Sequence, residues 1–243
     1  MFTPIYYLCI ACPTVERTLE MVDQYVKHGA FAFQIDMPSR NPFAETDFVK
    51  SMMKEAMSSV PDYDMYMDGL REIRRRHPDL ELHTVVYNDV VDAIGTERFS
   101  AFSKEIGAAS LMIPGASAEN LLFLELEGFK VFRTIPHELP EVRIRLAQAV
   151  GSHGIISLRN RKPGERDRPG LETFERKYRY IVQERGVCSP VYSVFGIQTP
   201  EELAEIKKTG ARGAIIGNVL MRLWEDKQAC LTLLEKFQAL AER

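Results

Sequence analysis

The chain has 243 residues, of which 45% are hydrophobic and 27% charged, and its formal net charge is -3. This composition is ordinary for a globular protein, and no segment offers the roughly 18 uncharged apolar residues that a membrane span needs. The small net charge creates no field that would attract nucleic acid or an anionic membrane surface. The apolar start of the chain lacks a basic leading region, so we expect a core strand there, no signal peptide and a cytoplasmic location.

Apolar runs of strand length alternate with amphipathic helical stretches from the start of the chain. In the first half, the predicted strands are Pro4 to Ala11, Ala30 to Met37, Leu80 to Tyr87 and Ser110 to Ile113. The predicted helices of this half include Val15 to His28, Met65 to His77, Glu97 to Ile106 and Ala118 to Glu127. Each of these helices is long enough to cross back over a parallel sheet.

The second half of the chain continues the same alternation. Its predicted strands are Lys130 to Ile135, Gly154 to Leu158, Pro190 to Phe195 and Gly213 to Ile216. Its predicted helices include Glu141 to Val150, Leu171 to Glu184 and Glu201 to Thr209. Thr199 and Glu202, on either side of the first-turn Pro200, predict a capping box where the last of these helices begins.

Eight strands that alternate with helices in one unbroken chain favour a single (β/α)8 TIM barrel over residues 1–243. An open doubly wound sheet usually has fewer parallel strands and a glycine-rich first turn, and no GxGxxG follows the first predicted strand. In such a barrel, the loops that leave the carboxyl ends of the strands build the active site. Polar groups in those loops are therefore the candidate site residues.

Glycines follow the last three predicted strands, where barrels often bind phosphate with backbone N–H groups. Gly164 follows the sixth strand, Gly196 the seventh, and Gly217 with Asn218 the eighth. The sequence thus predicts a phosphate site of the ribulose-phosphate-binding type. The alternative is that these glycines only relieve tight turns.

A basic segment, Arg159 to Arg168, surrounds Gly164. A flexible basic loop beside an anion site could fold over a substrate and exclude water, which makes this segment a candidate lid. The alternative is a solvated loop whose charges are partly matched by Glu165 and Asp167.

The cysteines and histidines give little sign of metal or redox chemistry. The four cysteines do not form a disulfide framework. Cys9 and Cys12 form a CxxC, but on a strand their odd spacing would send the side chains to opposite faces. The five histidines show no metal-ligand spacing. We therefore expect neither a metal nor an organic cofactor.

The run from Phe33 to Glu45, which reads FQIDMPSRNPFAE, resembles the signature of the alpha subunit of tryptophan synthase. In that family, Glu-Leu-Gly-hydrophobic-Pro is followed by Phe-Ser-Asp-Pro and then by Ala-Asp-Gly-Pro. Further short matches extend over nearly the whole chain: Ala11-Cys12-Pro13, Val86-Tyr87-Asn88, Gly95-Thr96-Glu97-Arg98-Phe99, Ile113-Pro114, Phe195-Gly196-Ile197, Thr199-Pro200-Glu201 and Ile216-Gly217-Asn218.

The resemblance implies a barrel that splits indole-3-glycerol phosphate into indole and glyceraldehyde 3-phosphate by a retro-aldol step, usually together with a beta subunit. Carried over by position, the implied phosphate contacts are Gly164, Gly196, Gly217 and Asn218, and the implied pocket residues are Tyr7 and Tyr87.

The catalytic half of the family pattern is altered. Gln34 stands at the family's acid/base glutamate, and an amide cannot exchange a proton usefully near neutral pH. Glu45 replaces the loop aspartate, and Asp36 replaces a glycine two residues beyond Gln34, which places it on the same strand face. A buried acid at position 36 could have a raised pKa and take over proton transfer. The alternative is that Asp36 only hydrogen-bonds the backbone at the strand end.

Two further departures concern the pocket wall and the partner surface. Aligned through Pro136, Arg133 falls on an apolar family position against the indole, and Ile155 falls on a pocket tyrosine. Arg133 would then meet a carboxylate of the chain or of the substrate, or it would reach outward to solvent. The segment Ile113 to Ala116 lacks the aspartate that the family uses in coupling to the beta subunit. Ser39 to Asn41 differs from the family sequence in the loop that contacts that subunit. A beta-like partner is therefore less well supported, and a homo-oligomer is the other option.

These observations favour a cytoplasmic carbon–carbon lyase that acts on indole-3-glycerol phosphate or a related phosphorylated molecule. Asp36 and Glu45 would move protons, Gln34 would orient the substrate, and Arg133 and Arg159 would contact its negative charge. One alternative is an inactive alpha-like subunit that binds a phosphorylated ligand and regulates a partner. Another is a different phosphate-binding barrel enzyme, such as an isomerase.

Overall fold

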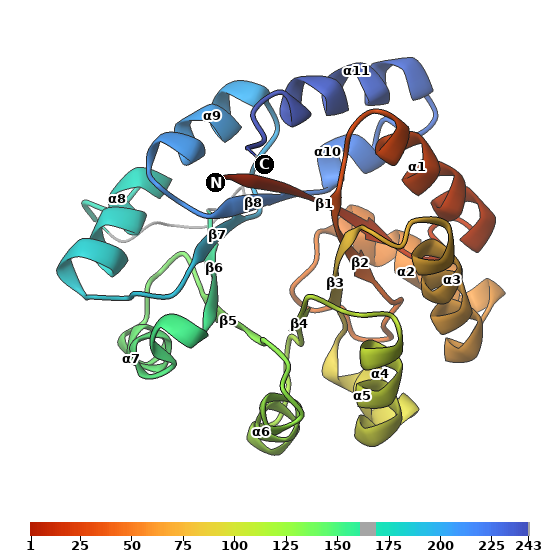
Figure 1. Cartoon of the computed structure of the whole chain (residues 1–243), viewed down its shortest axis with the longest axis horizontal. Coiled ribbons are helices and arrows are strands. Elements are labelled where there is room, and N and C mark those ends of the chain that lie inside the picture. Colours follow the sequence, from red (N-terminus) through yellow and green to blue (C-terminus); the bar gives the residue numbers. More distant parts are fainter. Residues whose placement is uncertain (161–168, 243) are drawn as a thin grey trace. The chain divides into compact units, whose positions relative to one another are not determined.

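The computed structural model describes residues 1–160 and 169–242. The described residues form two compact units. We call Tyr6–Val131 the N-terminal unit, and Met1–Ile5 together with Phe132–Arg243 the C-terminal unit. Within each unit, parallel strands alternate with helices (Figure 1).

The N-terminal unit contains parallel strands that pair side by side in chain order. They are β1 (Thr3–Cys9, whose first residues belong to the C-terminal unit), β2 (Ala32–Asp36), β3 (Glu81–Val85) and β4 (Ser110–Met112). The helices are α1 (Val15–Lys27), α2 (Asp47–Ser59), α3 (Tyr63–Arg76), α4 (Asn88–Ile94), α5 (Thr96–Glu105) and α6 (Ala118–Leu126).

The C-terminal unit repeats this arrangement with β5 (Phe132–Ile135), β6 (Ile155–Arg159), β7 (Val191–Val194) and β8 (Gly213–Ile216), paired in that order. The backbone N–H of Thr3 donates to the carbonyl of Arg212, just before β8. The helices are α7 (Glu141–Ala149), α8 (Phe174–Arg179), α9 (Pro200–Lys208), α10 (Asn218–Met221) and α11 (Lys227–Gln238). A 3-10 turn, Gly151–His153, precedes β6, and a π-helical turn, Tyr180–Glu184, follows α8.

The predicted strands are confirmed, and each observed strand begins and ends within two residues of the predicted bounds. The predicted capping box is also present. The Thr199 hydroxyl accepts from the backbone N–H of Glu202, whose carboxylate accepts from the Thr199 N–H. Such a cap is worth about 1 kcal/mol. The helix predicted from Leu171 begins later, at Phe174, where Thr173 supplies the cap.

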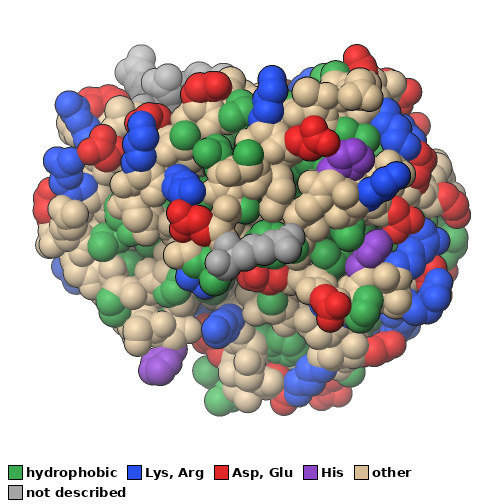
Figure 2. All heavy atoms as spheres, turned by 45° about the horizontal axis from the view of Figure 1, so that its top comes forward, with side chains coloured by type: hydrophobic (Ala, Val, Ile, Leu, Met, Phe, Trp, Pro, Cys, Tyr) green, Lys and Arg blue, Asp and Glu red, His purple; other side chains and the backbone are tan. Residues whose placement is uncertain are grey.

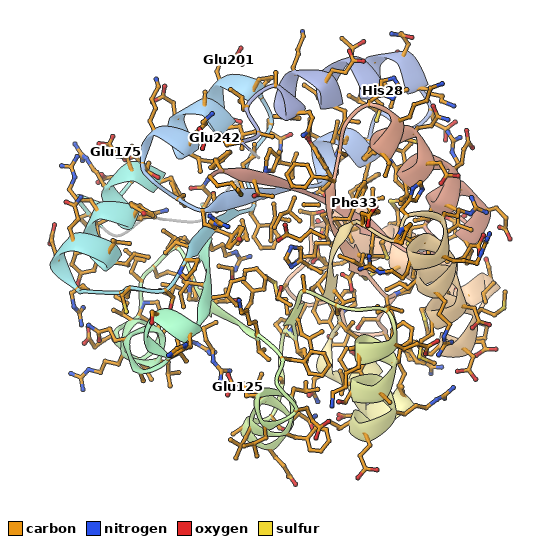
Figure 3. The ribbon with its side chains drawn as sticks, viewed as in Figure 1. His28, Phe33, Glu125, Glu175, Glu201 and Glu242 are labelled. Carbon is orange, nitrogen blue, oxygen red and sulfur yellow. The ribbon has the colours of Figure 1, made fainter. Side chains whose placement is uncertain are left out.

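The two faces of β1 and β2 have different surroundings. On one face, Tyr6 and Phe33 pack against Tyr25 of α1, with ring centroids 6.0 to 6.3 Å apart; Phe33 is labelled in Figure 3. Tyr7 and Gln34 are register partners, and they point to the opposite face because side chains alternate along a strand. This opposite face carries the candidate catalytic side chains.

The first residue of β8, Gly213, lies against the backbone of β1. A Cβ at this position would overlap the carbonyl oxygen of Thr3 and come within 2.9 Å of the Tyr192 ring. We expect Gly213→Ala to lower the free energy of unfolding by about 3 kcal/mol, measured by denaturant titration. Gly128→Ala is the control, because Gly128 has a φ of 92° but open space around it, so only strain of about 1–2 kcal/mol applies. Equal losses in the two variants would contradict the close approach.

Among the described residues, no helix is both long and apolar enough to cross a membrane. Figure 2 shows basic and acidic side chains interspersed over the face in view. This distribution agrees with the small formal net charge of -3.

Candidate active site

Asp36 ends β2 with its side chain completely buried. The hydroxyl of Tyr7, on the neighbouring β1, donates to Asp36 Oδ2 at 2.9 Å. The other carboxyl oxygen, Oδ1, has no hydrogen-bond partner within the described chain. Buried polar atoms without partners are rare in folded proteins, and they often mark a functional group.

The surroundings of Asp36 favour its neutral form. Burial raises the pKa of this carboxyl well above its ordinary value of 3.8, and the nearby Glu45 raises it further. The hydrogen bonds from Tyr7 and from the backbone N–H of Met37 offset only part of this increase. These surroundings therefore raise the pKa of Asp36 in the predicted direction. Its predicted role in proton transfer stays a hypothesis.

Gln34 lies two residues before Asp36 on the same face of β2 and is only 3% exposed. Its amide nitrogen, Nε2, also has no hydrogen-bond partner among the described residues. An amide N–H₂ is a donor that stays neutral at every physiological pH. This position can hold and orient a substrate oxygen, but it cannot transfer a proton.

Glu45 belongs to the loop between β2 and α2, and the structure holds it near Asp36. The Tyr87 hydroxyl donates to Glu45 Oε1 at 3.3 Å, and the Phe43 ring packs edge-on against Tyr87 with centroids 5.4 Å apart. Burial, and then the charge of Glu45, raises the pKa of Tyr87. Tyr87 therefore keeps its hydroxyl proton and can donate a hydrogen bond to the Glu45 carboxylate.

Asp89, in α4, fixes the beginning of the same loop, and our sequence predictions missed it. Its carboxylate accepts from the Ser39 hydroxyl at 2.8 Å and from the backbone N–H of Arg40 at 3.1 Å. The sequence did contain a signal, because Asp89 directly follows the Tyr87-Asn88 motif at the end of β3. A carboxylate so close to a strand end lies within reach of the neighbouring loop.

The strand geometry considered for the CxxC does not apply to Cys12. β1 ends at Cys9, and the chain turns at Ala11, which has a φ of 61°, so Cys12 does not lie on a strand. Burial, and then the neighbouring Cys12 thiol, raises the pKa of the Cys9 thiol, and both cysteines are free and buried. A protonated thiol is a poor nucleophile and a poor metal ligand. No cluster of three or more metal-ligating side chains occurs in the described ranges.

The predicted phosphate contacts that the structure describes lie in the C-terminal unit. Phe195 and Gly196, after β7, have φ values of 67° and 76°. Gly217 is the N-cap residue of α10, which begins at Asn218. The guanidinium of Arg159, at the end of β6, lies 4.8 Å from the centroid of the Phe195 ring. Gly164 and the rest of the candidate lid after residue 160, from 161 to 168, lie outside the described residues.

Arg133 and Ile155 both align with pocket positions of the family, and an outward direction was the alternative for Arg133. Ile155 pairs with Phe132, whereas Arg133 pairs with Ile156. Paired residues in a parallel sheet share a face, so Arg133 and Ile155 lie on opposite faces of the sheet. At most one of the two side chains can therefore line a pocket on one face of this sheet.

Comparison with known proteins adds to this geometry. The family model of the tryptophan synthase alpha chain matches residues 3–125, just over half of the 243 residues. The chain belongs to the tryptophan synthase alpha chain family. The family assignment made from the sequence motifs is confirmed.

Relatives within the tryptophan synthase alpha chain family span nearly the whole chain. The alpha chain of Vibrio vulnificus strain CMCP6 is 26% identical over 245 residues, which cover 97% of this chain and 90% of that one. The alpha chain of Methanosarcina mazei is 28% identical over 228 residues, which cover 91% and 81%. The family therefore accounts for both compact units.

A solved structure of the tryptophan synthase a2b2 complex from Pyrococcus furiosus contains a chain that is similar in fold. It matches with a TM-score of 0.81 and 18% identity, over 99% of this chain and all of that one. The (β/α)8-barrel fold class predicted from the sequence is confirmed. In that complex from a hyperthermophile, the alpha chain assembles with a beta subunit, as the name of the complex states.

Proposed function

We propose that the chain is a carbon–carbon lyase of the aldehyde-lyase type, which cleaves indole-3-glycerol phosphate or a closely related phosphorylated substrate by a retro-aldol step. The observation that carries this proposal is the buried Asp36 carboxyl, whose Oδ1 has no partner within the described chain, beside Gln34 Nε2, which also has none. Membership of the alpha chain family supports the substrate class.

The retro-aldol step needs one proton donor and one proton acceptor. The bond between the ring carbon and the hydroxyl-bearing carbon breaks. The ring carbon gains a proton, and the hydroxyl loses one as its carbon becomes an aldehyde. Asp36 delivers the first proton from Oδ1, and Glu45, as the carboxylate, accepts the second. No net proton is gained or lost in the step. The Gln34 amide donates to a substrate oxygen and orients the molecule.

The phosphate of the substrate would bind to backbone N–H groups that follow the last strands. Backbone N–H groups at Gly196, Gly217 and Asn218 are the proposed contacts, together with Gly164 from outside the described residues. The turn at Phe195 and Gly196, which both have positive φ, supports this assignment, because barrels often bind phosphate in the loops after the last strands. The Arg159 guanidinium would add positive charge. Arg133, on β5, is a further candidate contact for negative charge of the substrate.

Purified protein incubated with indole-3-glycerol phosphate tests the proposal directly. We expect indole and glyceraldehyde 3-phosphate to form in equal amounts, without added metal or cofactor. Activity that requires an added beta subunit would extend the proposal to a two-subunit enzyme, as in the Pyrococcus furiosus complex. No product under either condition would contradict it.

A second candidate function is an inactive alpha-like subunit that binds a phosphorylated ligand. The observation that favours it is Gln34, whose amide cannot act as the acid/base group of the family. Calorimetric titration with indole-3-glycerol phosphate separates the two candidates. Tight binding with no turnover, with or without a beta subunit, would support the inactive subunit.

A further inference from the structure

Tyr7 and Asp36 form a buried pair between β1 and β2. Tyr7 is 8% exposed and Asp36 is fully buried. The Tyr7 hydroxyl donates to Asp36 Oδ2 at 2.9 Å, and Oδ1 has no partner in the described chain. The two oxygens of the Asp36 carboxyl group therefore differ in their hydrogen bonding, because only Oδ2 accepts from Tyr7.

A protonated carboxyl group has one hydroxyl oxygen and one carbonyl oxygen. The carbonyl oxygen is the better acceptor, so a neighbouring O–H donor selects it and leaves the acid proton on the other oxygen. The same logic fixes the tautomer of a histidine whose second nitrogen is hydrogen-bonded. Applied to this pair, Oδ2 of Asp36 is the carbonyl oxygen and Oδ1 carries the proton.

We propose that Tyr7 is a positioning residue, whose hydroxyl occupies Oδ2 of Asp36 and so keeps the transferable proton on Oδ1. This inference rests on the proposed lyase function and deepens it. The sequence resemblance assigned Tyr7 to the pocket wall. The hydrogen bond instead gives it a role through Asp36, since its single hydroxyl proton is already committed to Oδ2.

The groups that face Asp36 keep this arrangement stable. They are Tyr7 and Cys9 from β1, Cys12 from the following turn, Glu45 from the loop after β2, and Tyr87 from the end of β3. Burial, and then the nearby acidic groups of Asp36 and Glu45, raises the pKa of Tyr7. Tyr7 therefore remains a donor and Asp36 remains the group that holds the proton.

The kinetic test replaces Tyr7 by Phe, which removes the hydroxyl and keeps the ring. We expect kcat to fall roughly 10- to 100-fold while KM changes by less than about twofold, because the lost interaction acts on the proton donor and not on substrate binding. In an Asp36→Asn background the same change should cost almost nothing, since two residues that act as a unit are not additive. Tyr6→Phe is the matched control, because Tyr6 points to the opposite face.

A second measurement does not depend on turnover. The Asp36 carboxyl is labelled with carbon-13 in the full-length protein, assigned by its loss in Asp36→Asn, and titrated by NMR. The hydrogen bond from Tyr7 lowers the pKa of Asp36, so Tyr7→Phe should move the titration midpoint upward, whereas Tyr6→Phe should leave it in place.

The outcomes separate this inference from the proposed function. If the wild type releases no indole but the Asp36 titration responds to Tyr7→Phe, the pair holds and the lyase proposal fails. If Tyr7→Phe leaves the titration unchanged, the inference is overturned. It is also overturned if Tyr7→Phe costs as much activity in the Asp36→Asn background as in the wild type.

Discussion

Replacing Asp36 by Asn should lower kcat for indole release by roughly 10²- to 10⁴-fold, the range typical of a removed acid/base group. The amide keeps the shape and the hydrogen bond from Tyr7, but it has no acidic proton to deliver. Steady-state kinetics with indole-3-glycerol phosphate measure this loss directly. The loss should fall on kcat, because Asp36 contributes to the transition state more than to ground-state binding.

Asp79→Asn is the matched control for this variant. Asp79 lies on the exposed loop between α3 and β3, so the same change of side chain there should leave kcat within about twofold. Far-ultraviolet circular dichroism and denaturant unfolding establish that both variants are folded. A folded Asp36→Asn enzyme with wild-type turnover would refute the assignment of the proton donor.

Replacing Glu45 by Gln should produce the second largest loss, roughly 10²-fold or more in kcat. The carboxylate accepts the hydroxyl proton of the substrate, and an amide cannot do so near neutral pH. The Tyr87 hydroxyl can still donate to the amide oxygen, so the loop should stay in place. The measurement is the same kinetic assay, run at several pH values. It identifies which limb of the plot of kcat against pH is present in the wild type and lost in Glu45→Gln.

Glu55→Gln provides the comparison for Glu45. Glu55 is exposed on α2 and belongs to the same segment that follows the loop. Its replacement should change neither kcat nor KM by more than about twofold. If Glu45→Gln raised KM alone and left kcat intact, Glu45 would be a binding residue and the proton acceptor would have to be sought elsewhere.

The sequence predicted the strands well because their signal is local. Alternating apolar runs, glycines at helix ends and the Thr199 capping box each depend on residues that are close in the chain. The shared face of Gln34 and Asp36 follows from the period of two along a strand, and it needs no tertiary information.

The pairings within the site could not be predicted in the same way. The hydrogen bond between Tyr7 and Asp36 joins residues 29 positions apart and depends on the register of β1 against β2. Register also places Arg133 and Ile155 on opposite faces, because a shift of one residue moves a side chain to the other face. The position of Cys12 depends on the turn at Ala11, whose left-handed backbone no simple residue pattern predicts.

The central claim is that, in the folded chain, Asp36 keeps its proton at pH values well above the ordinary pKa of this side chain. Because the folded pKa is raised above the unfolded value of 3.8, proton binding stabilises the folded state fully below pH 3.8. This stabilisation is lost as the pH rises through the folded pKa, at about 1.4 kcal/mol per pH unit.

Denaturant unfolding of the wild type and of Asp36→Asn across a series of pH values tests this most directly, because the difference between the two proteins isolates the one carboxyl. The account predicts that the wild type loses stability relative to Asp36→Asn by about 1.4 kcal/mol for each pH unit above 3.8, until the folded pKa is reached. A difference that does not change with pH across this range would show that Asp36 ionises normally, and the proposed proton donor would be lost.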